Sequence, residues 1–118
     1  MDLTIAVIVG LIAVLHLYFL TLEMFLWDKP AGRRAFGLSA EEAATTKVLA
    51  ANQGLYNGFL AAGLIWGLYL GRAGTDITVF FLLCVLAAGL FGAATASRKI
   101  LFIQALPAAV ALVLIALR

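Results

Sequence analysis

The sequence predicts an all-α integral membrane protein, an antiparallel bundle of four transmembrane helices that forms a single domain over residues 1–118. Two observations lead to this fold class. Hydrophobic residues make up 65% of the chain and charged residues 12%, with a mean hydropathy of +1.13, which leaves too little polar surface to face water. The apolar residues also gather into four segments, each near the ~20 residues that cross a ~30 Å hydrocarbon core.

The apolar segments are themselves the predicted spans. In a bilayer the backbone groups of each segment have to be satisfied internally, so each is expected to be helical, and none alternates as a barrel strand does. The first segment begins without a basic residue and is too long for the core of a secretory signal, so we interpret it as an uncleaved span. The expected spans are residues 3–27, 48–70, 77–96 and 100–117.

The connections between the spans differ in kind. Residues 28–47 form a long loop whose proline and two glycines break regular structure. Near its end Ser39 and Glu42 have the spacing of a capping box, so the second helix is expected to begin near Ser39 and run on into the membrane. The connections at 71–76 and 97–99 are short, which makes neighbouring helices antiparallel.

The basic residues predict the orientation of the bundle. An even number of spans puts the first and third connections on one side, and together they carry six Lys and Arg residues. The other side carries only Arg72 and Arg118. Because basic residues favour the cytoplasmic side, we expect a protein of the cell (inner) membrane with both connections in the cytoplasm and both termini outside.

Small residues at four-residue spacing predict how the helices pack, because helices in lipid associate through close contact rather than by exclusion of water. The second helix is rich in such residues and is expected to be central. Pro107 in the fourth helix predicts a kink. The glycines of the second helix are Gly54, Gly58, Gly63, Gly67 and Gly71.

Seven polar residues inside the predicted spans are the candidate ligand-binding residues. An ionisable side chain in a span costs about 2.5–3.5 kcal/mol on insertion scales and is a functional hypothesis by default. At a rise of 1.5 Å per residue all seven lie roughly 6–16 Å deep, between the cytoplasmic surface and the midplane. We therefore expect one polar pocket in the inner half of the bundle. The residues are His16, Glu23, Asn52, Gln53, Tyr56, Asn57 and Gln104.

Within this pocket antiparallel packing is expected to bring His16 near Asn57 and Glu23 near Asn52. Structural interpretations stand beside the functional one. Glu23 is close enough to the surface to pair with a basic residue of the first connection, and His16 suits a neutral imidazole satisfied by a neighbouring helix. The amides and the tyrosine serve equally as interhelical glue, at about 0.6–2 kcal/mol for each hydrogen bond.

The other side chains predict little chemistry. One His, one Glu and a single Cys84 in an apolar run leave a metal site short of ligands, so we expect neither a metal nor a cofactor. We find no phosphate-binding glycine loop and no Ser or Cys nucleophile with a plausible base. The net charge of +2 gives no reason to expect a nucleic-acid partner. Whether the chain is an enzyme stays open.

Motifs along the whole chain carry a resemblance to a known family. They are His16-Leu17-Tyr18, Leu22-Glu23-Met24-Phe25-Leu26-Trp27, Asn52-Gln53-Gly54-Leu55-Tyr56-Asn57-Gly58 with its flanks, and Gln104-Ala105-Leu106-Pro107. They look like the domain of unknown function 1304 family, small four-helix membrane proteins of bacteria and fungi. The resemblance implies no particular activity, but it implies that the seven candidate residues and Pro107 are motif positions.

A second resemblance, in architecture, is to the membrane-associated eicosanoid and glutathione metabolism proteins, which are four-helix proteins of similar length that form trimers. Asn52 and Tyr56 are similar to an Asn-x-x-x-Tyr element in their second helix. That helix also carries an Arg just before the Asn and a Glu just before the Tyr, where this chain has Ala51 and Leu55. The resemblance therefore implies the architecture and not the thiol chemistry.

Three functions remain open from the sequence. A site for a lipid-like or small amphipathic ligand, with membrane lipid as the partner, is favoured by the confinement of the polar residues to one half of the bundle. A structural or partner-binding membrane subunit, such as a homo-oligomer, accounts for the same residues as glue. A small transporter is less favoured, because a pathway needs polar groups at both depths.

Overall fold

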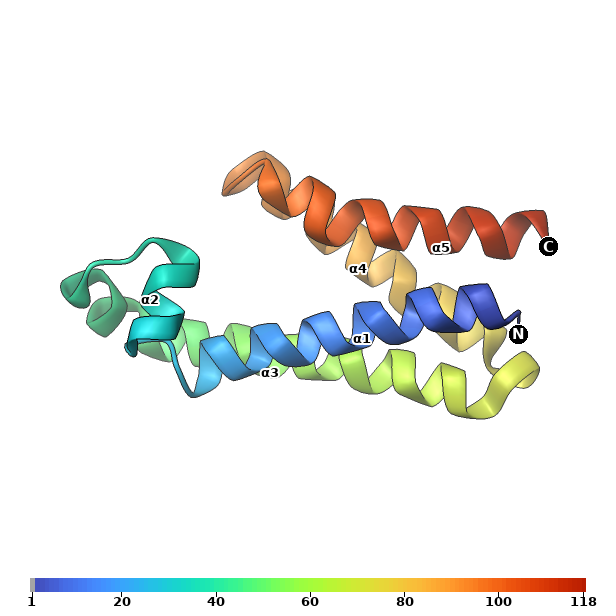
Figure 1. Ribbon diagram of the computed structural model, residues 1–118, viewed down its shortest axis with the longest axis horizontal. Coiled ribbons are helices and arrows are strands. Elements are labelled where there is room, and N and C mark those ends of the chain that lie inside the picture. The colour runs from blue at the N-terminus through green and yellow to red at the C-terminus, as the bar shows by residue number, and fades with distance from the viewer. Residues whose placement is uncertain (1) are drawn as a thin grey trace. The chain divides into compact units, whose positions relative to one another are not determined.

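The computed structural model describes residues 2–118, and within them the chain is all-α, as the sequence predicts (Figure 1). The helices form two compact units, which are described separately. The first unit comprises residues 2–14 and Leu60–Arg118, and the second unit comprises Leu15–Phe59. The elements in chain order are α1 (Leu3–Met24), α2 (Pro30–Phe36), α3 (Ala40–Leu70), the 3-10 turn η1 (Gly71–Gly74), α4 (Thr75–Thr95), the π-helical segment η2 (Leu101–Ala105) and α5 (Leu106–Leu117).

The long helices agree closely with the predicted apolar segments. The capping box forms as predicted: the backbone N–H of Ser39 donates to Glu42 Oε1 at 3.0 Å, and the backbone N–H of Glu42 donates to Ser39 Oγ at 3.1 Å. For this reason α3 begins ahead of its apolar segment and reaches 31 residues. By contrast, α1 ends at Met24, short of the predicted Trp27.

The first connection is not the unbroken loop that the sequence predicts, because it contains the short helix α2. The residues that favour a loop instead mark the ends of this helix. Pro30 occupies the first turn, where no intrahelical donor is needed, and Gly37 ends the helix in the left-handed conformation at φ 63°. The backbone N–H of Leu38 then donates to the carbonyl of Arg33 at 2.9 Å, which completes the turn out of the helix.

The first unit has an apolar core in which α4 packs antiparallel against the end of α3. Gly63 and Gly67 of α3 lie against Phe81 and Thr78 of α4, and a Cβ at either glycine would overlap its neighbour. The small residues thus allow the close approach that their spacing predicts. The buried apolar residues of this unit are Ile5, Val9, Ile12, Ala13, Leu64, Leu82, Val85, Ala108 and Ala111.

The last helical run, Leu101–Leu117, changes its winding near its start. In η2 the turns are π-helical, and the backbone N–H of Leu106 donates to the carbonyl of Leu101, five residues earlier. This wide turn precedes Pro107, whose ring would clash with the carbonyl four residues before it in a regular α-helix. The kink expected at Pro107 stays a prediction, and the structure shows a widened turn on the N-terminal side of this proline.

In the second unit the connection after α1 closes onto the start of α3. The ring of Trp27 packs against Phe36 of α2 with centroids 4.8 Å apart, and Trp27 Nε1 donates to Thr46 Oγ1 at 3.0 Å. Lys47 Nζ donates to Asp28 Oδ2, also at 3.0 Å. These contacts fix the end of α1 beside residues 46–47 of α3.

Two helical runs in residues 2–118 are long and apolar enough to cross a membrane. One is Leu3–Met24, and the other is Ala40–Thr95, in which η1 joins α3 to α4. Leu101–Leu117 is a shorter apolar helix. By length and composition, the architecture thus supplies helices that suit a bilayer.

Candidate functional site

Two glycines of α3 bring it close to α1 in the second unit. A Cβ added at Gly54 would lie 2.6 Å from Met24 Cγ and 3.1 Å from Glu23 Cβ, and one at Gly58 would lie 2.8 Å from Leu20 Cδ1. These neighbours follow one another in opposite directions along the two helices, so α1 and α3 are antiparallel here. The close approach confirms the contact expected from the glycine spacing and puts polar side chains of both helices within reach of each other.

A hydrogen bond between buried side chains joins the two helices at this point. Asn57 Nδ2 donates to Glu23 Oε1 at 2.5 Å, and Asn57 and Glu23 are only 6% and 8% exposed. A buried amide or carboxyl group that loses its partner costs about 1–3 kcal/mol. The two side chains therefore stabilise the pairing of α1 and α3 as long as both are present.

His16 is the second ionisable residue of α1 in this unit. It lies two turns from Glu23 on the same face of the helix and is completely buried. Its ring meets the ring of Phe19 edge-on, with centroids 5.8 Å apart and ring planes at 75°. The predicted proximity of His16 to Asn57 stays a prediction.

The other candidate residues of α3 face outward and form what we call the α3 polar surface: Asn52, Gln53 and Tyr56. Asn52 Nδ2 donates to the carbonyl of Val48 at 3.2 Å, within its own helix. The Tyr56 side chain is 56% exposed, and its ring lies 6.2 Å from that of Phe59. These residues therefore line the outside of α3, in contrast to the buried Asn57 of the same helix.

The common pocket expected for Asn52, Gln53 and Tyr56 with the buried residues stays a prediction. The expected pairing of Glu23 with Asn52 is corrected, because Glu23 meets Asn57, more than one helical turn further along α3. The prediction assumes that α1 stays helical to Trp27. The helix ends earlier, and irregular chain covers more distance per residue than the 1.5 Å rise of a helix.

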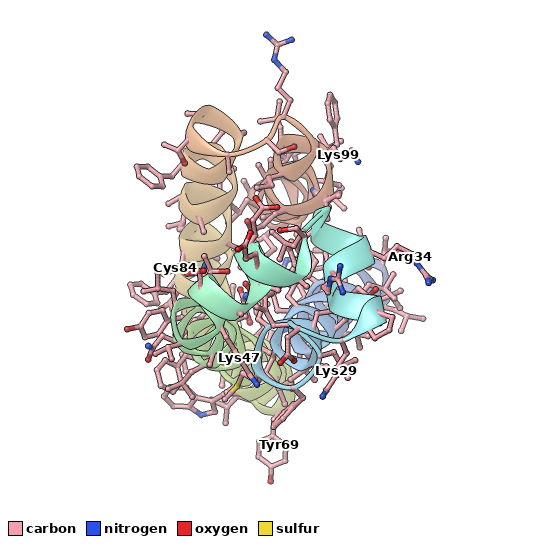
Figure 2. The ribbon with its side chains drawn as sticks, turned by 90° about the vertical axis from the view of Figure 1, so that its left-hand side faces the viewer. Lys29, Arg34, Lys47, Tyr69, Cys84 and Lys99 are labelled. Carbon is pink, nitrogen blue, oxygen red and sulfur yellow. The ribbon has the colours of Figure 1, made fainter. Side chains whose placement is uncertain are left out.

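The basic residues of the first connection do not pair with Glu23. Among residues 2–118, the ion pair present joins Lys47 to Asp28, and its hydrogen bond is the main cause that lowers the pKa of Asp28 below its usual value. Lys29 and Arg34 of the first connection and Lys47 of α3 are exposed (Figure 2). Glu23 is held by an amide of α3, so the interpretation in which it reaches the surface for a cation is wrong.

Two residues singled out from the sequence belong to the first unit. Gln104 lies half-buried in η2, and its participation in a common site with Glu23 and Asn57 stays a prediction. Cys84 is half-buried in α4. Across the described residues 2–118, no three His, Cys, Asp or Glu side chains gather closely enough to hold a metal ion.

Three features of the structure were not anticipated from the sequence. The first is the contact of Trp27 with Thr46. The second is the contact of Asp28 with Lys47, for which the opposite charges at the two ends of the connection were an available signal. The third is the buried hydroxyl of Thr78, which has no hydrogen-bond partner within residues 2–118. No sequence signal marks that hydroxyl, because threonine is common on apolar helices.

Comparisons with known proteins place all of the candidate residues inside one matched region. A family model described as "Protein of unknown function (DUF1304)" matches residues 10–116. The chain is also 31% identical over 96 residues to the "Uncharacterized protein YpaA" of Lactococcus lactis, a match that covers 80% of this chain and 81% of that protein. No solved structure gives a significant match.

Proposed function

This chain belongs to the DUF1304 family, and we propose that it is a multi-pass membrane subunit whose α3 polar surface binds a second copy of the chain. The proposal combines a location in the bilayer with a use for the outward polar residues. The family description brings no activity with it, so both parts depend on the residues of this chain.

The apolar exterior supports the membrane location. In the most apolar 18-residue stretch of each long helical run, only 28% and 22% of the residues are buried. A core helix of a soluble protein is mostly buried. Large hydrophobic side chains such as Val48, Phe91 and Leu117 stand exposed. Soluble monomers rarely expose apolar surface on this scale, and lipid accounts for it.

The proposed topology has four spans in the inner membrane, in α1, α3, α4 and Leu101–Leu117, with both termini outside the cytoplasm. It is supported by the six basic residues in the first and third connections against two elsewhere. A reporter fused after Arg118 tests it. Activity of a reporter that works only in the cytoplasm would overturn the topology, and recovery of the chain in the soluble fraction would overturn the membrane location.

The observation that carries the proposed association is the α3 polar surface itself. Its two amides and one phenol stand among exposed apolar side chains of the same helix, including Leu55 and Phe59. In hydrocarbon an amide side chain finds no partner beyond its own helix, so such residues favour contact with other protein. A second copy suits this surface, because each amide has both a donor and an acceptor and can pair with its symmetry mate across a two-fold axis.

The oligomeric state in nanodiscs tests this association. We expect the wild type to be at least dimeric and the Asn52→Leu/Tyr56→Leu variant to dissociate more readily, by about 3- to 30-fold for each lost hydrogen bond. Tyr69→Leu is the matched control, since Tyr69 is an 86% exposed tyrosine of the same helix outside the α3 polar surface. A monomeric wild type, or equal weakening by the control, would contradict the proposal.

A second candidate function, binding of a lipid-like or small amphipathic ligand, is favoured by the buried ionisable residues of α1. A link between helices needs only neutral groups, yet this chain buries both Glu23 and His16. A ligand whose polar group interacts with these residues gives them a role that helix packing does not require.

A melting screen against lipids and small amphiphiles tests the ligand. A compound that binds only the folded chain raises its melting temperature by mass action, and His16→Leu is expected to abolish that gain while leaving the chain folded. If no compound stabilises the wild type, the ligand-binding candidate is rejected. The oligomeric state is a separate measurement, so the two candidate functions succeed or fail independently.

A further inference from the structure

An apolar groove lies in the first unit between α4 and the helix that follows it. Its volume is about 270 Å³, and its lining includes Leu86 and Leu90 from α4 and Phe102, Leu106 and Ala109 from η2 and α5. Every lining side chain is apolar. Walls of this kind lose van der Waals contacts unless hydrocarbon lies against them, so a groove on a membrane helix pair favours an acyl chain.

The groove has a local cause in the sequence. The π-helical turns of η2 widen the helix ahead of Pro107, while Gly89 lets α4 approach η2 at one point. A Cβ at Gly89 would lie only 2.6 Å from the backbone nitrogen of Ala105. The backbones therefore touch where the side chains are smallest, and the larger side chains on either side form the walls of the groove.

Two basic residues stand at the turn that joins α4 to η2. Arg98 and Lys99 are exposed, and neither takes part in an ion pair in the part of the chain that the structure describes (Figure 2 shows Lys99 at this turn). The acidic residues of the first unit are elsewhere. Asp2 precedes α1, and Asp76 lies in the first turn of α4, ~28 Å along that helix from the turn.

We propose that the groove and the basic turn together bind one anionic phospholipid, with its phosphate at Arg98 and Lys99 and one acyl chain along the groove. The basic turn lies next to the apolar groove, as the phosphate of a lipid lies next to its acyl chains, because η2 begins two residues after Lys99. The groove is smaller than the ~300–1,000 Å³ of typical small-molecule pockets, which suits a single hydrocarbon chain. This inference rests on the proposed membrane location and not on the proposed association.

The headgroup is tested by lipid titration of the full chain in mild detergent, with the melting temperature as the readout. We expect phosphatidylglycerol to bind about 25-fold more tightly than phosphatidylcholine, since each basic residue near an anionic headgroup contributes about fivefold. Arg98→Gln/Lys99→Gln is expected to remove this preference. Lys29→Gln/Arg34→Gln, which removes the same charge from the exposed first connection, is expected to keep it.

Three outcomes of this titration would overturn the inference. They are equal binding of the two lipids by the wild type, loss of the preference in the control variant, and stabilisation by inorganic phosphate as strong as that by phosphatidylglycerol. The last would identify a free-anion site instead of a lipid site. A chain that fractionates with the membrane but shows no headgroup preference fails this inference alone, whereas a soluble chain fails the proposed location.

The acyl chain is tested by changing the walls of the groove. Ala109→Leu fills it and is expected to weaken both lipids alike, leaving their ratio unchanged, while Ala116→Leu on the exposed side of α5 has no effect. Leu90→Ala removes part of a half-exposed side chain that lines the groove, and it is likewise expected to weaken the binding of both lipids. If both groove variants bind phosphatidylglycerol as the wild type does, the groove is not the site.

Discussion

The two units hold their helices together by different means. In the second unit a hydrogen bond between the buried Asn57 and Glu23 joins α3 to α1. In the first unit the core is apolar, and the hydroxyl of Thr78, its one buried polar residue, has no partner in the described chain. The glycines at the contacts between long helices differ as well, since Gly54 faces the flexible Met24 side chain whereas Gly89 faces the backbone of Ala105.

The difference shows that one chain can hold some helices together by close packing of small residues and others by hydrogen bonds between buried polar side chains. Where helices meet backbone to backbone, added volume has nowhere to go, and the first unit should be sensitive to size. Where a carboxyl and an amide satisfy each other, loss of either leaves the other buried without a partner, and the second unit should be sensitive to polarity. Measurements of stability in detergent can separate these two sensitivities.

Among the substitutions that compare contacts between the long helices, the greatest loss of stability is predicted for Gly89→Ala in the first unit. The new methyl group would meet the backbone of Ala105, and overpacking of this kind costs up to about 3 kcal/mol. Gly54→Ala should cost much less, because Met24 Cγ can move aside. Gly10→Ala, with no atom within 4 Å of the new Cβ, should be neutral or raise stability by up to about 1 kcal/mol. Equal losses at Gly54 and Gly89 would remove the proposed difference between the units.

A loss of about 1–3 kcal/mol is predicted for Asn57→Leu in the second unit, because it leaves Glu23 buried without its donor. Glu23→Gln retains an acceptor for Asn57 and should cost less. The double variant Asn57→Leu/Glu23→Leu removes both polar groups and should recover part of the stability. The measurement is a double-mutant cycle on the free energy of unfolding. If the two single losses simply add, the hydrogen bond does not stabilise the pairing of α1 and α3.

The sequence predicts the long helices and their glycine contacts because both depend on local information. Apolar length defines α1, α3 and α4, the Ser39 capping box sets the start of α3, and the Gly54 and Gly58 spacing marks a close approach. The register of Glu23 with Asn57 depends on something less local, namely where α1 ends and how the irregular chain crosses to α3. A hydrophobic pattern predicts neither the end of α1 nor the path of the irregular chain.

The division of the candidate site into buried and outward residues was harder to predict. The spacing shows that Asn52 and Tyr56 share one face of α3 and that Asn57 lies on another. It does not show which face turns inward, because the apolar residues of α3 are spread around the helix and mark no single buried stripe. The buried face of α3 is determined by the helix that packs against it. Glu23 of α1 lies opposite Asn57, and nothing in the sequence of α3 alone indicates this.

Thr78→Val should have the opposite sign to the loss at Asn57. It removes a buried hydroxyl that has no partner in residues 2–118 and nearly keeps the shape that packs against Gly67. Stability should stay unchanged or rise by up to about 1 kcal/mol. Thr95→Val is the control, because that exposed hydroxyl donates to the carbonyl of Phe91 in its own helix. A clear loss at Thr78 would show that polar pairing also operates in the first unit.

The smallest effect is predicted for the exposed ion pair between Asp28 and Lys47, which joins the connection after α1 to α3 in the second unit. Lys47 lowers the pKa of Asp28 in the folded chain below its usual 3.8, so the pair stabilises the folded state above about pH 4, and this contribution is lost as the pH falls through the folded pKa. Lys47→Met should therefore lower the melting temperature slightly at neutral pH and low salt, and the difference should vanish near pH 2 or in 1 M salt. The buried hydrogen bond of Glu23 should be far less sensitive to salt, because ions screen exposed charges most. A Lys47→Met loss that persists at low pH and high salt would assign the effect to the packing of the lysine stem.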